Sequence, residues 1–214
     1  MKKIVLLFAL SIILAGCSGE NAADKMYEHL EKSVELEQPF ADQQEPFMKL
    51  EEEDQTIYNE LIELSSDEMD QIKTLQEEAL TNIDKRREML ATEKESIEAA
   101  EKEFGNISEY VPELKEEVAA KAEEMAKVME ERFSTYYKLN EAYQNSLNED
   151  VKLYELFVKE ELTEEELTEQ INTVNKLYEE VLDLNNQFNE LTDSYNILKE
   201  EFYKAADLNV VFED

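Results

Sequence analysis

An unbroken heptad repeat near the C-terminus constrains the fold of this chain more than any other feature. Apolar residues fill every a and d position over five heptads, with Val174, Val181, Phe188, Tyr195 and Phe202 at a, and Leu177, Leu184, Leu191, Leu198 and Ala205 at d. Helices that pack along a shared seam have this pattern. Ile171 and Tyr178 widen the apolar stripe, which favours a bundle of several helices over a two-stranded coiled coil.

Turn-forming residues are scarce throughout the chain. The 214 residues include 3 Gly and 3 Pro, whereas average usage would give roughly 15 and 10. β-Sandwiches, barrels and α/β sheets need far more frequent turns, so they are excluded. The net charge of −33 is typical of disordered chains, but 42% hydrophobic residues at helical spacing argue against disorder.

Proline, glycine and helix-capping residues divide the chain into four predicted helical stretches. The first covers about 24–64, where Pro39 and Pro46 should kink or divide it. The second runs to Phe104, with Gly105 as its stop. The third should begin between 108 and 112 and continue to about 158, and the fourth follows Thr163. Ser65 to Glu68 and Thr163 to Glu166 both have the form of a capping box.

Short connections between these stretches make neighbouring helices antiparallel. The chain is therefore predicted to be all-α, an elongated antiparallel four-helix up-and-down bundle with coiled-coil-like packing over residues 24–206. Helices of this length would make a rod on the order of 60 Å long. Arg86 and Glu93 occupy d positions of the second stretch, where we expect them to narrow the seam.

The N-terminus has the pattern of a secretory signal sequence. Lys2 and Lys3 precede the apolar run 4–14, which is too short to span a bilayer and is typical of a secretory signal. It ends in Leu14-Ala15-Gly16-Cys17, the lipobox of bacterial lipoproteins. We expect residues 1–16 to be removed and Cys17 to carry a diacylglyceryl group with palmitate-like chains, since two acyl chains give stable anchoring. An incidental thiol is the alternative, disfavoured because Cys17 is the only cysteine.

Residues that carry catalysis or bind cofactors are not evident. The single histidine, His29, lies on an amphipathic helix and is expected to be a surface or boundary residue. A ferritin-like di-iron centre needs Glu-x-x-His on two helices, but Met26 stands three positions before His29. No glycine-rich phosphate loop or calcium loop occurs. We therefore expect no enzyme activity, no cofactor and no metal site.

Acidic runs such as Glu51 to Asp54 and Glu160 to Glu166 could hold Ca²⁺ or Mg²⁺ loosely. With 54 acidic residues on helices, chance pairs are numerous, so solvated faces are the expected interpretation. The small basic cluster 85–87 lies among acids, and the negative field excludes nucleic acid as a partner.

Tyrosines gather on the third and fourth stretches, and their spacing predicts core packing for most of them. A sugar- or peptide-binding face is the alternative, and Tyr137 and Tyr203 are the expected exposed exceptions. Residues 17–23 form the lipidated cysteine and a short tether. Residues 207–214 form a C-terminal tail that packs on the bundle end or, alternatively, waits for a partner.

Several segments carry a resemblance to a known family: the lipobox at Cys17, then Tyr27-Glu28-His29-Leu30-Glu31, Leu36-Glu37-Gln38-Pro39-Phe40, Arg87-Glu88 and Glu93-Lys94-Glu95-Ser96-Ile97. Over essentially the whole mature chain, the sequence resembles the cell-wall-binding lipoprotein family of Gram-positive bacteria, the YkyA-like proteins. The resemblance implies a closed, left-handed four-helix up-and-down bundle and wall binding, and it implies no catalytic residues.

Charge restricts what such a protein can bind. Cleavage after Gly16 removes two lysines and leaves 19 basic against 54 acidic residues, a net charge of −35. Teichoic acids and lipid headgroups are anionic and would repel this body. Wall binding would then need bridging divalent cations, a peptidoglycan-directed patch or a basic protein partner.

The sequence thus favours a non-enzymatic, lipid-anchored helical bundle at the outer face of the cytoplasmic membrane of a Gram-positive cell. It would bind wall or envelope proteins through a side face or through the end near residues 65 and 162. The alternative is a surface lipoprotein that binds a small ligand or a divalent cation.

Overall fold

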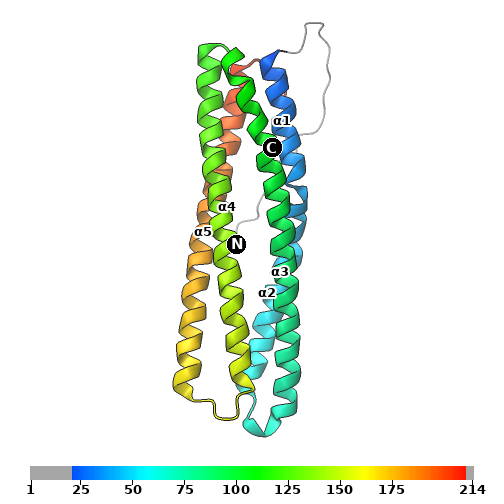
Figure 1. Ribbon diagram of the computed structural model, residues 1–214, viewed down its shortest axis with the longest axis vertical. Coiled ribbons are helices and arrows are strands. Elements are labelled where there is room, and N and C mark those ends of the chain that lie inside the picture. Colours follow the sequence, from blue (N-terminus) through cyan, green and yellow to red (C-terminus); the bar gives the residue numbers. More distant parts are fainter. Residues whose placement is uncertain (1–20, 211–214) are drawn as a thin grey trace. The chain divides into compact units, whose positions relative to one another are not determined.

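The computed structural model describes residues 21–210, which are helical almost throughout and contain no strand (Figure 1). The long helices are α1 (Ala22–Leu36), α2 (Gln38–Glu63), α3 (Met69–Gly105), α4 (Glu116–Phe157) and α5 (Glu164–Ala205). Three 3₁₀ turns connect them: η1 (Ser66–Glu68), η2 (Asn106–Glu109) and η3 (Val111–Glu113). The predicted signal peptide, Cys17 and residues 211–214 lie outside the described range.

Capping side chains fix where the helices begin. Asn21 Oδ1 accepts hydrogen bonds from the backbone N–H groups of Ala23 and Asp24, at 2.9 and 3.1 Å, so α1 begins earlier than the predicted residue 24. At α5 the predicted capping box is confirmed, because Glu166 N donates to Thr163 Oγ1 and Thr163 N donates to Glu166 Oε2, both at 3.2 Å. Ser65 N likewise donates to Glu68 Oε2 at 3.0 Å, and this pair opens the turn η1 that leads into α3.

Proline divides the first predicted stretch at one of its two positions. The chain breaks at Glu37, between α1 and α2, because Pro39 has no N–H with which to continue the helical ladder. Pro46 lies inside α2, which continues through it.

Of two predictions around residue 105, the start of the third stretch needs correction and the stop at Gly105 is confirmed. The third long helix does not begin between 108 and 112 but at Glu116, because two 3₁₀ turns occupy 106–113 and Leu114 is extended, with ψ 158°. Gly105 does end α3, although not through a left-handed backbone. Its φ of −56° and ψ of −25° are right-handed helical values that any residue adopts.

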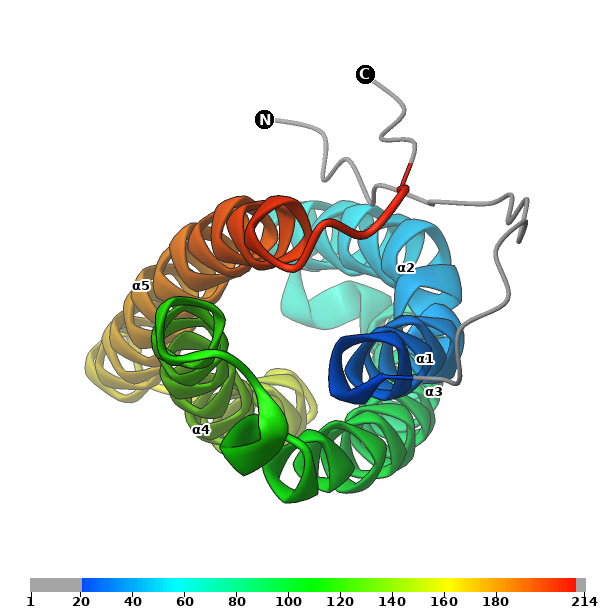
Figure 2. The same ribbon diagram turned by 90° about the horizontal axis from the view of Figure 1, so that it is seen from above.

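Contacts group the chain into two compact units, and each of the helices α2 to α5 contributes to both. Unit 1 contains the described residues 21–41, 96–136 and 186–210, and unit 2 contains 42–95 and 137–185. Figure 2 looks onto the end of unit 1, where α1, α4 and the last turns of α3 and α5 stand around a shared interior.

Within unit 1, side-chain contacts define antiparallel neighbours. Along α1, Ser33 contacts Ala100 of α3 while the earlier His29 contacts the later Glu103. Along α4 and α5, Lys121 pairs with Glu201, and Arg132 with Thr192. The register therefore decreases along one helix as it increases along the next, as expected for an up-and-down bundle.

Unit 2 has the same arrangement around its own core. Gln44 of α2 contacts Glu93 of α3, while the later Leu50 contacts the earlier Asn82. Twelve buried residues form the core: Phe47, Leu61, Ile72, Leu75, Ala79, Ile83, Leu90, Ala142, Tyr143, Leu147, Tyr154 and Val181. The all-α, antiparallel four-helix fold predicted from the heptads is confirmed.

The heptad seam of α5 is buried unequally. All five a residues are buried, whereas the d residues are half-buried and Ala205 is exposed, so the a row faces the core most directly. Tyr203 was expected at the surface, but it is fully buried. Its hydroxyl donates to Glu31 Oε1 at 2.7 Å, and this hydrogen bond makes burial of the polar end tolerable.

A left-handed residue ends α5. Asp207 has a φ of 58°, Leu208 N donates to Tyr203 O at 3.0 Å and Asp207 N donates to Lys204 O at 3.2 Å. This pair of backbone hydrogen bonds is a Schellman motif. The first residues of the predicted tail are thereby tied to the end of α5.

Candidate functional site

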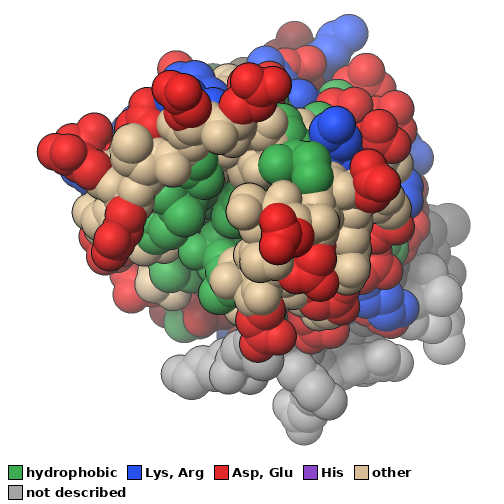
Figure 3. Space-filling view, turned by 90° about the horizontal axis from the view of Figure 1, so that it is seen from below, with side chains coloured by type: hydrophobic (Ala, Val, Ile, Leu, Met, Phe, Trp, Pro, Cys, Tyr) green, Lys and Arg blue, Asp and Glu red, His purple; other side chains and the backbone are tan. Residues whose placement is uncertain are grey.

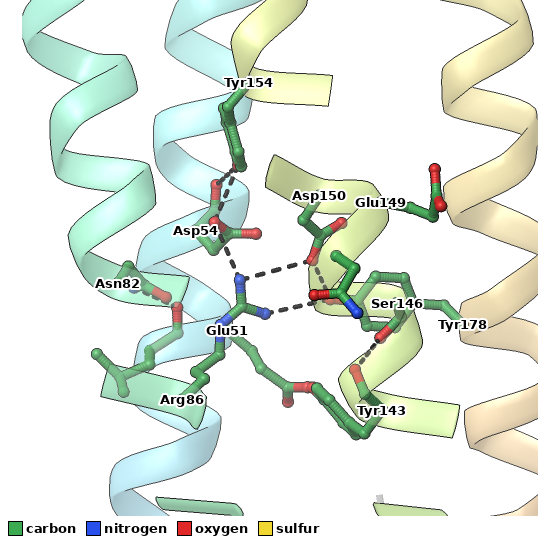
Figure 4. A network of polar contacts seen from close by, with 12 residues as sticks. Glu51, Asp54, Asn82, Arg86, Tyr143, Ser146, Glu149, Asp150, Tyr154 and Tyr178 are labelled. Carbon is green, nitrogen blue, oxygen red and sulfur yellow. Dashed lines mark hydrogen bonds and ion pairs between the residues drawn. The ribbon is translucent and has the colours of Figure 1, made fainter. Parts of the chain in front are cut away.

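The most concentrated polar chemistry of unit 2 surrounds Arg86 of α3 (Figure 4). Its heptad position d directs the side chain inward, and the side chain is 1% exposed. Helix α2 contributes Asp54, helix α4 contributes Asp150 and helix α5 contributes Tyr178. One guanidinium group thus contacts all three of the other helices that contribute to unit 2.

Distances in this Arg86 network show a chain of charge-assisted contacts. Arg86 Nη2 lies 3.3 Å from Asp54 Oδ1 and 3.7 Å from Asp150 Oδ2. Arg86 Nη1 donates to Tyr178 OH at 3.2 Å, and that hydroxyl donates to Asp150 Oδ2 at 2.6 Å. Tyr154 OH donates to Asp54 Oδ1 at 2.9 Å. Nearby, Tyr143 OH donates to Glu51 Oε1.

Burial dominates the electrostatics of the carboxyl groups. It raises the pKa of Asp150 to about 6, against the Tyr178 hydrogen bond and the Arg86 charge, which both lower it. Burial likewise raises the pKa of Asp54, opposed by Arg86 and Tyr154. For Arg86 itself, burial lowers the pKa, but Tyr178, Asp54, Tyr143 and Asp150 outweigh burial and raise it overall. Arg86 therefore stays charged. Together with the hydrogen bonds from Tyr178 and Tyr154, it limits how far burial raises the pKa values of Asp150 and Asp54.

This geometry is that of a buried ion cluster. Two inward-facing acids with raised pKa values can act as a catalytic pair where they share a pocket, and Asp54 and Asp150 face inward with raised pKa values. They face a guanidinium group, however, and none of the network residues lines the surface groove of about 480 Å³ that includes Pro46, Lys49, Lys85 and Met89. Loss of one partner would leave an uncompensated buried charge, so the cluster favours the helix register that keeps Arg86 beside Asp54 and Asp150.

A second buried ion pair lies in unit 1, at the break between α1 and α2. Arg132 of α4 donates from Nη1 and Nη2 to the two carboxylate oxygens of Glu37, each at 2.7 Å. Its Nε donates to Thr192 Oγ1 at 2.7 Å, and its guanidinium lies 4.4 Å from the ring centroid of Phe188. A bidentate pair with these added contacts is the strong form of a buried ion pair.

Ser96 of α3 forms hydrogen bonds with the backbone at the same break. Its hydroxyl donates to Leu36 O at 2.6 Å and accepts from Phe40 N at 3.2 Å, so it stands between two groups that would bond each other in a continuous helix. Two of the segments that carry the family resemblance, 36–40 and 93–97, therefore meet in space. Ser96 is the side chain of these segments that joins them, through the backbone of Leu36 and Phe40.

Glu93 is the buried acid without a cationic partner in the structure as described. It is 5% exposed, and Gln44 Nε2 donates to its Oε1 at 3.0 Å. Burial raises the pKa of Glu93 to about 8. Both Glu93 and Arg86 were expected to narrow the apolar stripe of the second stretch. Instead, both side chains are buried within the helix interface. A charged residue at a d position was the sequence signal for both.

His29 and most of the acidic run 51–54 lie near the surface, as predicted. His29 is half-buried, as expected for a boundary residue; its Nδ1 lies 2.7 Å from Glu103 Oε1, and its ring stacks on Tyr110. Glu52 and Glu53 are exposed, as expected for a solvated face, whereas Asp54 turns inward to Arg86.

Metal ligands and membrane spans are two further features of residues 21–210 that bear on function. No group of three or more His, Cys, Asp or Glu side chains in this range could hold a metal ion. None of the helices in it is both long and apolar enough to cross a bilayer.

Comparison with known proteins gives three matches. Residues 21–205 match the model of a family described as "Putative cell-wall binding lipoprotein". A Bacillus subtilis (strain 168) protein named "Uncharacterized lipoprotein YkyA" is 34% identical over 209 residues, 97% of this chain and 94% of that protein. A crystal structure of a conserved Staphylococcus aureus protein of unknown function is similar in fold, with a TM-score of 0.72 over 87% of this chain and 98% of the other, at 14% identity.

Proposed function

Because the chain belongs to the YkyA family of lipoproteins, we propose that it is a non-enzymatic helical bundle anchored by Cys17 to the outer face of the cytoplasmic membrane. There it binds the cell wall or other envelope proteins. The observation that carries this proposal is the lipobox Leu14-Ala15-Gly16-Cys17, which stands directly before a body of family type.

The anchor and the body support each other physically. Removal of residues 1–16 would leave Cys17 at the new N-terminus, and α1 begins at Ala22. The intervening residues 18–21 reach about 14 Å when extended, at up to 3.6 Å per residue. A diacylglyceryl group on Cys17 would therefore hold the start of α1 close to the lipid surface.

The buried charges support a structural body. Arg132 pairs with Glu37 at the α1–α2 break, and Arg86 joins Asp54, Asp150 and Tyr178 in unit 2. Each cluster links helices within one unit. Arg132 donates from its three nitrogens to Glu37 and Thr192. Arg86 keeps ion pairs and one hydrogen bond, while its buried Nε has no hydrogen-bond partner among the described residues. These contacts are those of side chains that hold helices together.

Membrane fractionation tests the anchor. The wild-type chain is expected in the membrane pellet, and the Cys17→Ala variant in the soluble or secreted fraction, because one thioether carries both acyl chains. Far-ultraviolet circular dichroism of both proteins provides the control for folding. Equal retention of both proteins in the pellet would contradict the anchor.

Chemical crosslinking in intact envelopes tests the binding role. Purification of the wild-type lipoprotein after crosslinking is expected to recover wall fragments or a reproducible envelope protein. The anchored chain recovered alone, at several crosslinker lengths, would contradict a binding role while leaving the anchor intact.

A further inference from the structure

One end of unit 2 leaves apolar side chains open to solvent. The connections 64–68 and 158–163 form this end together with the last turns of α2 and α4. Leu64, Met69, Phe157 and Val158 pack against the core of unit 2 but are only partly buried. Ile62, in the last turn of α2, is 52% exposed. Figure 3 looks onto this end and shows apolar side chains in a depression, which we call the end hollow.

Acidic side chains surround the end hollow. The segments 61–69 and 157–167 contain eight acidic residues and one basic residue, Lys159. The Lys159 ammonium is paired with Glu166. Figure 3 shows the red carboxylates standing around the depression. The end hollow is therefore an apolar surface inside a negative rim.

Local folding explains only part of this rim. Glu68 caps η1, and Glu164, Glu165 and Glu166 lie in the first turn of α5, where negative charge is favourable. Glu63, in contrast, lies in the last turn of α2, and Glu160 and Glu161 follow the end of α4. Carboxylates at a helix C-terminus oppose the helix dipole, and neither helix has a basic residue in its last turn. Glu63 therefore weakens the end of α2, whereas Glu160 and Glu161 lie in the connection between α4 and α5, outside both helices.

We propose that the end hollow is a docking site for a cationic amphipathic segment of an envelope protein, with its apolar face on Ile62, Leu64 and Val158 and its Lys or Arg side chains on the rim. This inference rests on the proposed function, for which it supplies the binding surface. Charge complementarity selects the occupant. Anionic wall polymers and lipid headgroups are repelled by the rim, and a second copy of this chain would bring the same acidic end.

An amphipathic helical peptide of Lys and Leu, labelled with a fluorophore, serves as the probe. Its binding to the full-length lipoprotein in detergent micelles is followed by anisotropy at physiological ionic strength. Saturable binding is expected. The variant Glu63→Gln/Glu160→Gln/Glu161→Gln should weaken it by about tenfold, because three rim charges are lost. The matched control Glu179→Gln/Glu180→Gln/Asp183→Asn removes three exposed charges of α5 and should leave the affinity within about twofold.

A second pair of variants tests the apolar part of the end hollow. Ile62→Asn should weaken peptide binding several-fold, whereas Leu182→Asn, at a residue of α5 that is 60% exposed, should not. Both side chains are exposed, so neither change should disturb folding. Absence of saturable binding, equal weakening by the two charge variants, or self-association that depends on Ile62 would each overturn the proposal. Membrane fractionation is scored separately, so an anchored chain that fails to bind the peptide overturns this inference alone.

Discussion

The carboxyl group of Glu93 makes stability depend on pH, as do the inward-facing acids Asp150 and Asp54, and its pKa is the one raised furthest toward alkaline pH. Its pKa is 4.5 as an ordinary glutamate and about 8 in the folded chain, where burial raises it. Between these pH values the folded state binds more protons than the unfolded state. The free energy of unfolding therefore contains a favourable contribution below about pH 4.5 that is lost as the pH rises to about 8.

Replacement of this carboxyl by an amide should remove that dependence. We expect Glu93→Gln to exceed the wild type in free energy of unfolding by roughly 2–4 kcal/mol near pH 8, and by much less near pH 5. Urea unfolding at the two pH values measures the difference. Glu95→Gln is the matched control, since Glu95 is exposed on the same helix. A Glu93→Gln variant whose stability falls with pH as steeply as that of the wild type would contradict the assignment.

Ser96 provides the second prediction at this scale. Without its hydroxyl, Leu36 O and Phe40 N lose their partner at the α1–α2 break. Ser96→Ala should therefore lower the free energy of unfolding by about 1–3 kcal/mol. Chemical denaturation checks this value, with Ser134→Ala at an exposed position of α4 as the control. An equal, small effect of both substitutions would show that water replaces the hydroxyl.

The backbone conformation at the end of a helix can be tested by single substitutions. Gly105 has a right-handed helical backbone, and a Cβ atom there would meet no other atom within 4 Å. Asp207, by contrast, has a φ of 58°, where side chains beyond Gly, Asn and Asp are strained. We expect Gly105→Ala to stabilise the chain by about 0.4–1 kcal/mol and Asp207→Ala to destabilise it by about 1 kcal/mol. Thermal melts of both variants measure the effects, and equal signs would refute the assigned backbones.

At the same scale, local sequence predicted the elements better than the positions between them. Thr163 and Glu166 lie within one turn, so their capping box was readable, and the heptads of α5 identified its buried face. The start of α4 was misplaced because Pro112 suits the first turn of a 3₁₀ turn as well as that of an α-helix. Which of the two forms depends on packing that the local sequence does not contain.

The candidate site was harder to predict than the helices. Arg86 and Glu93 were recognised as charged residues at d positions, but the partners of Arg86 were not. Tyr178 lies 92 positions away along the chain and contacts Arg86 only because the helices pack in this register. Tyr203 was misplaced for a similar reason, since its partner Glu31 belongs to the opposite end of the chain.

For the molecule as a whole, its net charge and its predicted membrane anchor determine which partners it can bind. A chain with 54 acidic and 21 basic residues has a field that repels anionic polymers and attracts cationic ones. Family membership and the antiparallel helical fold agree with a surface lipoprotein. The function proposed here, however, depends on one covalent bond, the thioether at Cys17, because a body of this charge would not stay at an anionic membrane without it.

Metabolic labelling with a palmitate analogue tests that bond most directly. Cells that produce the wild-type chain and the Cys17→Ala variant are grown with the label, and the two proteins are purified under denaturing conditions. We expect label on the wild-type chain and none on Cys17→Ala, because the acyl chains are attached through Cys17. A wild-type chain without label, or equal labelling of both, would contradict it.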